Sequence, residues 1–183
     1  MTKLLALAAA SLALGLPAVA HAELAHGAIA PNFVARGALA GQVFSVNHAQ
    51  ALKRGPVVLY FYPKAFTGGC TLEAHAFAEA SDQFRAAGAT VIGMSGDDLP
   101  TLQRFSTEAC RDKFAVASAT PAVIRAYDVD LIAGGKSTGL TKRTSYVIDR
   151  AGRIVFVHSD MDYKDHVRST LAAVQRLKSA RKG

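Results

Sequence analysis

The stretch that decides the fold runs from Val57 to Ala74 and reads V-V-L-Y-F-Y-P-K-A-F-T-G-G-C-T-L-E-A. Its first six residues form a continuous apolar and aromatic run that ends at Pro63, a pattern typical of a central strand buried on both faces. The segment from Thr71 to Ala87 then predicts a helix that ends near Gly88. The expected inward stripe repeats every four residues and consists of Leu72, Ala76, Ala80 and Phe84.

The loop between this strand and this helix places Cys70 at a helix N-terminus. Unpaired backbone N–H groups and the positive end of the helix dipole meet there, and both favour a thiolate over a thiol. Gly68 and Gly69 leave room for backbone N–H groups to approach a ligand, and Thr67 offers a hydroxyl in the same loop. Taken alone, Cys70 could equally be a buried structural cysteine in a helix cap.

The remainder of the chain continues an alternation of strands and helices around this unit. Residues 33–39 and 42–46 flank Ala40-Gly41 and predict an N-terminal β-hairpin. Further strands are expected at 90–95, 144–149 and 153–158, and further helices at 99–114, 121–127 and 163–180. Residues 131–140 are glycine-rich but lack the full phosphate-loop pattern, so we expect a loop that leads into the following strand.

This order of strands and helices predicts the fold class. We expect an α/β protein with a thioredoxin-like fold, in which helices flank a central mixed β-sheet. The chain has 183 residues, of which 50% are apolar and 19% charged, so it holds enough material for one packed core and is not intrinsically disordered. We see no internal repeat and no linker, and we therefore expect one domain.

The first 22 residues have the order of a secretory signal peptide. Lys3 is followed by an uncharged apolar run from Leu4 to Ala20, and Ala20-His21-Ala22 supplies a small-x-small cleavage signal. We therefore expect a signal peptide at 1–22 and a mature domain at 23–183, located in the periplasm or secreted. An uncleaved membrane anchor is the alternative.

The net charge of +7 is concentrated partly in the C-terminal segment. Cations suit the C-terminal end of a helix dipole, and the segment lacks interleaved aromatic residues, so we expect a solvated helix with no nucleic-acid partner and no stable membrane contact. The histidines are scattered without ligand spacing, and we expect neither a metal nor a cofactor. The basic residues of this segment are Arg168, Arg176, Lys178, Arg181 and Lys182.

Several segments of the sequence resemble those of a known family. Pro63-x-x-x-Thr67-x-x-Cys70 resembles the active-site motif of peroxiredoxins, and the longer run 60–74 is most similar to their Q-type branch, the bacterioferritin-comigratory proteins. Residues 27–33 (G-A-I-A-P-N-F) resemble the opening of the family, 91–95 match the strand after the first active-site helix, and 143–149 (R-T-S-Y-V-I-D) resemble the strand that supplies an arginine.

The resemblance implies a peroxiredoxin variant of the thioredoxin-like fold and a thiol-dependent peroxidase that reduces hydrogen peroxide and small organic hydroperoxides. It implies that Cys70 attacks the peroxide and becomes a sulfenic acid. Thr67 and backbone N–H groups near Gly69 would bind the peroxide oxygens. Arg143 would stabilise the thiolate and the departing oxygen. By the same resemblance, Pro63 would pack over the site and Glu73 would orient the arginine.

The second cysteine departs from the pattern of many Q-type members, which carry it five residues after the first. That position is His75 here, and Cys110 lies instead on the predicted helix 99–114. The resemblance implies that Cys110 resolves the sulfenic acid and that an external dithiol, a thioredoxin-like or glutaredoxin-like protein, reduces the disulfide. It also implies a monomer or weak dimer.

Two other roles for Cys110 stay open. It could be a bystander thiol, with Cys70 resolved by an external thiol. It could also form a permanent disulfide, because closing the 39-residue loop between the cysteines would stabilise the fold by roughly 4 kcal/mol.

The competing functional class is a periplasmic thioredoxin-like redox or metal carrier without peroxidase activity. The Cys-x-x-Cys register of such oxidoreductases reads Thr67-Gly-Gly-Cys70 here, which argues against dithiol exchange at one site. A copper or zinc site built from Cys70 and His75 is disfavoured, because residues five apart on a helix point to different sides.

Overall fold

The computed structural model describes residues 23–180 of the chain. The expected signal peptide at 1–22 and the last cations, Arg181 and Lys182, lie outside the described residues. Within residues 23–180, no helix combines the length and the apolar character needed to cross a membrane.

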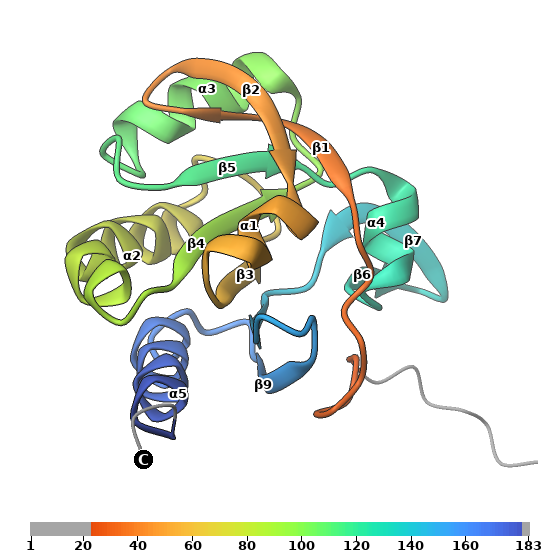
Figure 1. Cartoon of the computed structure of the whole chain (residues 1–183). Coiled ribbons are helices and arrows are strands. Elements are labelled where there is room, and N and C mark those ends of the chain that lie inside the picture. Colours follow the sequence, from red (N-terminus) through yellow and green to blue (C-terminus); the bar gives the residue numbers. More distant parts are fainter. Residues whose placement is uncertain (1–22, 181–183) are drawn as a thin grey trace, which may run out of the picture.

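The centre of the fold is a seven-stranded mixed sheet with the strand order β2-β1-β5-β4-β3-β8-β9 (Figure 1). The three inner strands β5, β4 and β3 run parallel, whereas β1 and β8 pair with this core in the antiparallel sense. This arrangement confirms the predicted thioredoxin-like α/β fold. The strand bounds are β1 (Val34–Leu39), β2 (Gln42–Asn47), β3 (Val57–Phe61), β4 (Thr90–Ser95), β5 (Ala115–Ser118), β8 (Thr144–Ile148) and β9 (Ile154–Ser159).

Helices cover both faces of this sheet and create two hydrophobic clusters. On one face lie α2 (Gly68–Ala86), α3 (Leu99–Glu108) and α5 (His166–Ala180), and on the other α1 (His48–Arg54) and α4 (Pro121–Ala126). Strand β3 supplies both clusters, because Tyr60 packs into the first and Leu59 and Phe61 into the second. Every residue of β3 is buried, as its continuous apolar run predicts.

The predicted N-terminal hairpin is confirmed. Strands β1 and β2 pair along their whole length from Val34↔Asn47 to Leu39↔Gln42. The two residues between them, Ala40 and Gly41, both have positive φ, of 50° and 72°, as a two-residue turn with the twist of a hairpin requires.

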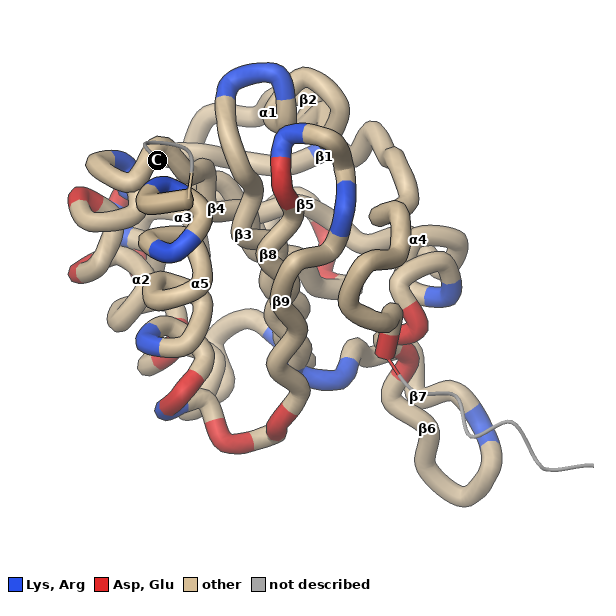
Figure 2. The backbone as a smooth tube through the Cα atoms, turned by 60° about the horizontal axis from the view of Figure 1, so that its bottom comes forward, with Lys and Arg blue, Asp and Glu red and all other residues tan. Residues whose placement is uncertain are grey.

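The prediction of a loop at 131–140 is wrong, because this segment forms a second hairpin. Strands β6 (Asp130–Ala133) and β7 (Lys136–Thr141) make a two-stranded sheet that projects from the body of the protein (Figure 2). Gly134 and Gly135 form its turn, with φ of 57° and 74°. Most of the hairpin is exposed, so its residues lack the alternation of apolar and polar side chains that marks a half-buried strand.

Two details of the predicted helices are also wrong. Helix α3 ends at Glu108 rather than at residue 114, because Arg111 and Asp112 adopt left-handed backbone angles that no α-helix accommodates. On α2, Leu72 is 50% exposed, whereas Glu73, Phe77 and Phe84 are buried. A strict spacing of four residues drifts about 40° around a helix at each step, so that stripe leaves the buried face.

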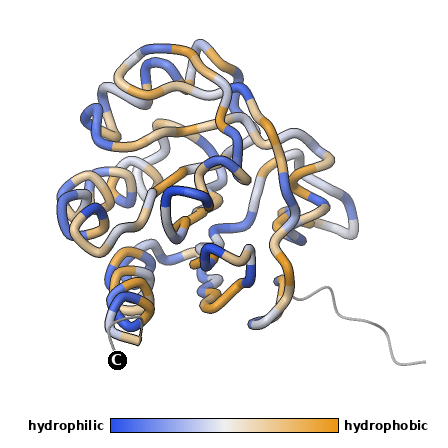
Figure 3. The backbone as a smooth tube through the Cα atoms, in the orientation of Figure 1, coloured by the Kyte–Doolittle hydropathy of each residue, from blue (hydrophilic) through white to orange (hydrophobic). Residues whose placement is uncertain are grey.

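The closing helix α5 is amphipathic, as predicted. Val174 is fully buried, and Val167, Leu171 and Leu177 pack against the same cluster as α2. Hydrophobic and hydrophilic bands alternate along this helix in Figure 3. It begins at His166 rather than at residue 163.

Candidate active site

Cys70 is the third residue of α2, and Thr67 is the residue that caps the helix. The first helical turn closes with a hydrogen bond of 2.9 Å from the Thr71 N–H to the Thr67 carbonyl. Cys70 is a free thiol with only 2% of its surface exposed. The predicted position at a helix N-terminus is confirmed, and the side chain lies beneath the surface.

Arg143 reaches Cys70 from a different part of the chain. It immediately precedes β8, whose first residue, Thr144, pairs with Phe61 at the end of β3. The Arg143 Nη2 donates to Cys70 Sγ over 3.4 Å, and Nε donates to the Met161 carbonyl over 3.0 Å. The sheet therefore brings together two residues that are 73 positions apart in the sequence.

Glu73 holds the remaining end of this guanidinium. Its Oε2 accepts from Arg143 Nη1 in an ion pair that is almost completely buried. Burial pushes the pKa of Glu73 upward, and the charge and hydrogen bond of Arg143 oppose this shift. For Arg143, burial acts to lower the pKa. The charges of Glu73 and Cys70 have the larger combined effect and raise the pKa of Arg143 above its usual value. Arg143 therefore stays a cation.

Behind Glu73 lies His166, which the sequence analysis did not single out. Its Nε2 donates to the Asp160 carbonyl over 2.9 Å, so Nδ1 is the acceptor for the Ser145 hydroxyl at 2.8 Å. Burial lowers the pKa of His166 to about 4, and the ring is neutral at pH 7. Its Nδ1 lies 3.8 Å from Glu73 Oε1, an oxygen that has no hydrogen-bond donor among the described residues.

Pro63 and Thr67 lie in the loop that carries Cys70. Pro63 is half-buried two residues beyond the end of β3, and Thr67 is exposed. The Thr67 hydroxyl donates to the Lys64 carbonyl over 2.9 Å, so the lone pairs of its oxygen remain available as acceptors. Both residues are positioned by the strand-to-helix connection, as the sequence predicts.

Two polar residues that the sequence analysis missed anchor this loop. Asp97, just after β4, accepts from the Ala65 N–H over 2.7 Å and from the Ser95 hydroxyl over 2.8 Å. Thr141, at the end of β7, donates its hydroxyl hydrogen to the Tyr62 carbonyl over 2.7 Å. The start of the loop is therefore tied to two neighbouring segments before it reaches Cys70.

Cys110 is also a free, fully buried thiol. The expectation that it lies on the second helix is wrong, because it sits two residues beyond the end of α3, where the Cys110 N–H still bonds to the Phe105 carbonyl. Cys110 and Cys70 belong to the same hydrophobic cluster. Burial, reinforced by the nearby Asp112 charge, raises the pKa of Cys110 far above the usual range, so in this conformation it is a protonated thiol.

Within residues 23–180, no group of three or more histidine, cysteine, aspartate and glutamate side chains is placed to hold a metal ion.

Comparison with known proteins gives a consistent result. The AhpC/TSA family profile matches residues 26–157. Peroxiredoxin Q of rice (Oryza sativa subsp. japonica), a chloroplastic protein, is 31% identical over 156 residues, which cover 85% of this chain and 69% of the rice protein.

Solved structures agree with this match. Peroxidoxin BcpB from Mycobacterium tuberculosis superimposes with a TM-score of 0.74 at 28% identity, covering 83% of this chain and 97% of that one. Peroxiredoxin Q from Xanthomonas campestris gives a TM-score of 0.68 at 27% identity, covering 78% and 90%. The chain belongs to the AhpC/TSA family and, within it, to the Q type of peroxiredoxins, which are thiol-dependent peroxidases.

Proposed function

We propose that this protein reduces hydrogen peroxide and small organic hydroperoxides with the thiolate of Cys70. The observation that carries this assignment is the contact of 3.4 Å between Arg143 Nη2 and Cys70 Sγ, in a guanidinium fixed at its other nitrogens by Glu73 and Met161. A buried cation that donates to sulfur stabilises the thiolate, which is the nucleophilic form. The helix N-terminus acts in the same direction.

In the first step, the Cys70 thiolate attacks the terminal oxygen of the peroxide. The S–O bond forms as the O–O bond breaks, and the hydroxyl stays on sulfur as a sulfenic acid. The departing oxygen takes up a proton and leaves as water or an alcohol. Arg143 lies beside the sulfur, where it also stabilises the negative charge that develops on the departing oxygen.

Peroxide binding is assigned to the loop before Cys70. The Thr67 hydroxyl hydrogen is already used by the Lys64 carbonyl, so Thr67 serves as an acceptor for the peroxide O–H. The free N–H groups of the first turn of α2 act as donors to the peroxide oxygens. Pro63, half-buried at the start of the loop, limits access of water.

Glu73 and His166 act on the reaction only through Arg143. Glu73 holds the guanidinium in place, and the neutral His166 ring packs behind Glu73 without adding a second positive charge. Both are positioning residues.

Organic hydroperoxides fit the surroundings of the site. Three large apolar side chains on the segments that form it are exposed, namely Phe66 at 39%, Leu72 at 50% and Met161 at 52%. An alkyl group gains by burying such surface. The structure of the Xanthomonas campestris bacterioferritin comigratory protein, which is 27% identical, is described in connection with alkyl peroxide reduction.

Cys110 is proposed as the resolving residue. Its thiol would displace water from the Cys70 sulfenic acid and form a disulfide, which an external dithiol then reduces. The two sulfurs belong to the same buried cluster, but each is shielded from solvent, so the segment around Cys110 must open first. Left-handed angles at Arg111 and Asp112 make this segment strained and support the assignment.

We further propose that the protein is exported through its first 22 residues and works in the periplasm or outside the cell, as a monomer or weak dimer. The reductant must then be a thioredoxin-like or glutaredoxin-like dithiol protein of that compartment. Intact mass of the protein recovered from a periplasmic fraction tests the export, since cleavage after Ala22 removes residues 1–22.

A single-turnover reaction tests the chemistry. The purified protein is fully reduced and mixed with one equivalent of hydrogen peroxide, and its intact mass and free thiols are followed over time. Rapid loss of both thiols, with a mass decrease of two hydrogens, is expected for resolution by Cys110. Gain of oxygen on Cys70 with Cys110 still free would assign a one-cysteine mechanism instead.

Two variants separate the roles of the cysteines. Cys70→Ser is expected to abolish peroxide consumption. Cys110→Ser should react once at an unchanged rate and then stop, because its sulfenic acid is not resolved. Full activity in the Cys70→Ser variant would overturn the proposed mechanism.

A further inference from the structure

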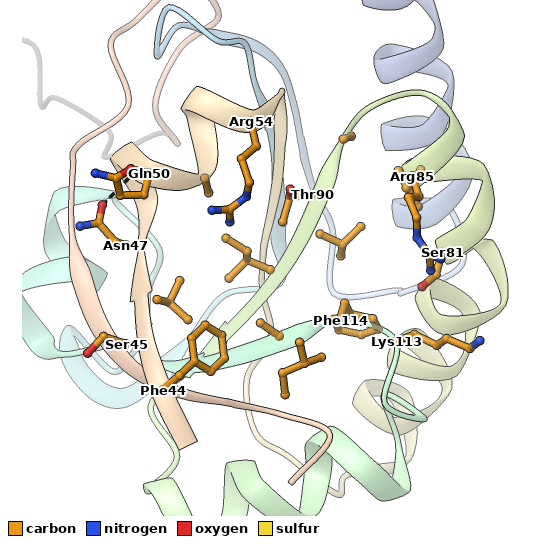
Figure 4. Close-up of a pocket in the computed structure, with 18 residues that line it drawn as sticks. Phe44, Ser45, Asn47, Gln50, Arg54, Ser81, Arg85, Thr90, Lys113 and Phe114 are labelled. Atoms are coloured by element: carbon orange, nitrogen blue, oxygen red, sulfur yellow. Dashed lines mark hydrogen bonds between the residues drawn. The ribbon is translucent and has the colours of Figure 1, made fainter. Parts of the chain in front are cut away.

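A cavity of about 510 Å³ lies beside the C-terminal end of α2 (Figure 4). Ser81, Phe84 and Arg85, from the last turns of α2, line it, whereas Cys70 is in the first turn. Phe84 lies 14 positions after Cys70, which corresponds to about 21 Å along the helix. A molecule in this cavity would therefore not be in position to react with Cys70.

The cavity has an apolar floor. It is formed where the β2–α1 segment meets the starts of β4 and β5, and its apolar residues include Phe44, Val46, Phe84, Val91 and Phe114. Its volume falls in the range of small-molecule sites, which are mostly apolar with a few polar groups. Phe44 is 40% exposed, so part of this floor faces solvent in the free protein.

The charged residues that line the cavity are all positive. They are Arg54, Arg85 and Lys113, and no aspartate or glutamate is among the lining residues. Within residues 23–180, Arg54 and Lys113 form no ion pair or side-chain hydrogen bond, and Arg85 pairs with Asp82 only on the exposed surface of α2. Charge complementarity therefore favours an anionic ligand and excludes a cationic one.

Figure 4 shows which of these positively charged side chains points into the cavity. Arg54 reaches from the end of α1 into the space beside β4, and its guanidinium lies near Thr90. Lys113 extends away from the apolar side chains. The Thr90 hydroxyl has no hydrogen-bond partner in the described part of the chain, so a donor beside Arg54 is free for a ligand.

We propose that this cavity binds a small amphipathic anion, with its carboxylate or sulfonate on Arg54 and Thr90 and its apolar body on the floor between Phe44 and Phe114. A guanidinium matches the geometry of a carboxylate, and the floor requires an aliphatic or aromatic group. A small inorganic anion would leave the floor uncovered, and a neutral alcohol would leave Arg54 without a counter-charge.

Octanoate is the probe, and 1-octanol is its neutral counterpart. Each is titrated into ¹⁵N-labelled reduced protein while backbone amide shifts are recorded by NMR. We expect saturable octanoate shifts at Phe44, Thr90 and Phe114 and no shifts around Cys70. Octanol should bind at least fivefold more weakly. Shifts that stay linear at millimolar octanoate, or that map to another part of the surface, would overturn the proposal.

Two substitutions on α1 form a matched pair. Arg54→Gln removes the proposed anion contact, whereas Lys53→Gln removes an adjacent exposed cation that does not line the cavity. The first should weaken octanoate binding at least fivefold, and the second should leave it within twofold. Equal effects of the two would assign the binding to the general positive field and refute the site.

A third variant tests the floor. Phe44→Ala removes a partly exposed ring from an edge strand, so the fold should survive, and octanoate affinity is expected to fall at least threefold. Unchanged affinity would contradict the proposed position of the apolar body. The single-turnover peroxide reaction serves as the check that each variant is folded.

Discussion

Arg143 and Glu73 form a buried ion pair beside the Cys70 thiol, which we propose to be the reactive one. Arg143 is 5% exposed and Glu73 is fully buried, so removal of either partner would leave an uncompensated charge inside the protein. The guanidinium also bonds to Cys70 and to the Met161 carbonyl, so it cannot rotate away from the sulfur without breaking several contacts. The position of the charge is thus set before any peroxide arrives.

A second residue, His48, makes stability depend on pH. Its ring is fully buried against Phe33, with ring centroids 5.2 Å apart, and neither ring nitrogen has a hydrogen-bond partner among the described residues. Burial lowers the pKa of His48 to about 4. In the unfolded chain the ring binds a proton near pH 6.5, so between these values the unfolded state binds more protons. Stability is therefore lost as the pH falls.

We predict that His48→Leu reduces this dependence, and that the contribution of the buried His166 remains. Urea unfolding of the reduced protein at pH 7 and pH 5 should show a loss of free energy of unfolding that is about 2 kcal/mol smaller in the variant than in the parent. The exposed His26→Leu is the control and should keep the parent's slope. The same slope in all three proteins would show that His48 does not stay neutral in the folded state at pH 5.

At the scale of elements, the first turn of α2 is fitted to the guanidinium that it faces. A Cβ atom at Gly69 would lie 3.3 Å from Arg143 Nη2, whereas one at Gly68 would meet nothing within 4 Å. Neither glycine has a positive φ, so an alanine at either position is free of backbone strain. The two positions differ in what a methyl group would touch.

We predict that Gly69→Ala slows the attack on peroxide more than Gly68→Ala does. The added methyl group pushes Arg143 away from Cys70 Sγ, and we expect a loss of roughly 10-fold in the rate constant of the single-turnover reaction, about 1.4 kcal/mol. The Gly68 variant should lose less than twofold. If both lose the same amount, crowding of the loop rather than displacement of Arg143 is responsible.

The same element shows what the sequence could and could not predict. The strand β3, the loop and α2 are local, and the apolar run, the glycines and Cys70 mark them directly in the chain. No motif in the sequence identifies Asp97 or His166, because each reaches the site only when β4 and α5 pack beside it. The hairpin β6–β7 was missed since it buries little and so leaves no periodic signal.

At the scale of the whole molecule, the hydrophobic clusters on the two faces of the sheet differ in which residues they contain. The face covered by α2, α3 and α5 holds both cysteines, whereas the other face holds an aromatic cluster with Phe61, Tyr127 and Tyr146 and no cysteine. The proposed opening of the segment from Ala109 to Phe114 would therefore disturb only one of the two clusters. The sheet and the α1–α4 face can keep the protein folded during this step.

Hydrogen exchange should reveal this local opening. After oxidation by one equivalent of peroxide, we expect the amides of residues 109–114 to exchange at least 10-fold faster than in the reduced protein, while those of β3 stay protected. The peroxide-treated Cys110→Ser variant is the control and should keep its protection. Formation of the disulfide without faster exchange would show that the sulfurs meet with the segment still packed.

The 73-residue separation of Cys70 and Arg143 has a consequence for the newly made chain. In the folded protein the pairing of β8 with β3 brings the guanidinium to the sulfur from a distant part of the sequence. A chain in which this pairing has not formed lacks the contact between Arg143 and Cys70. Under the mechanism proposed above, reactivity depends on completed folding, and a copy truncated before β8 would consume little peroxide and keep its own thiol reduced.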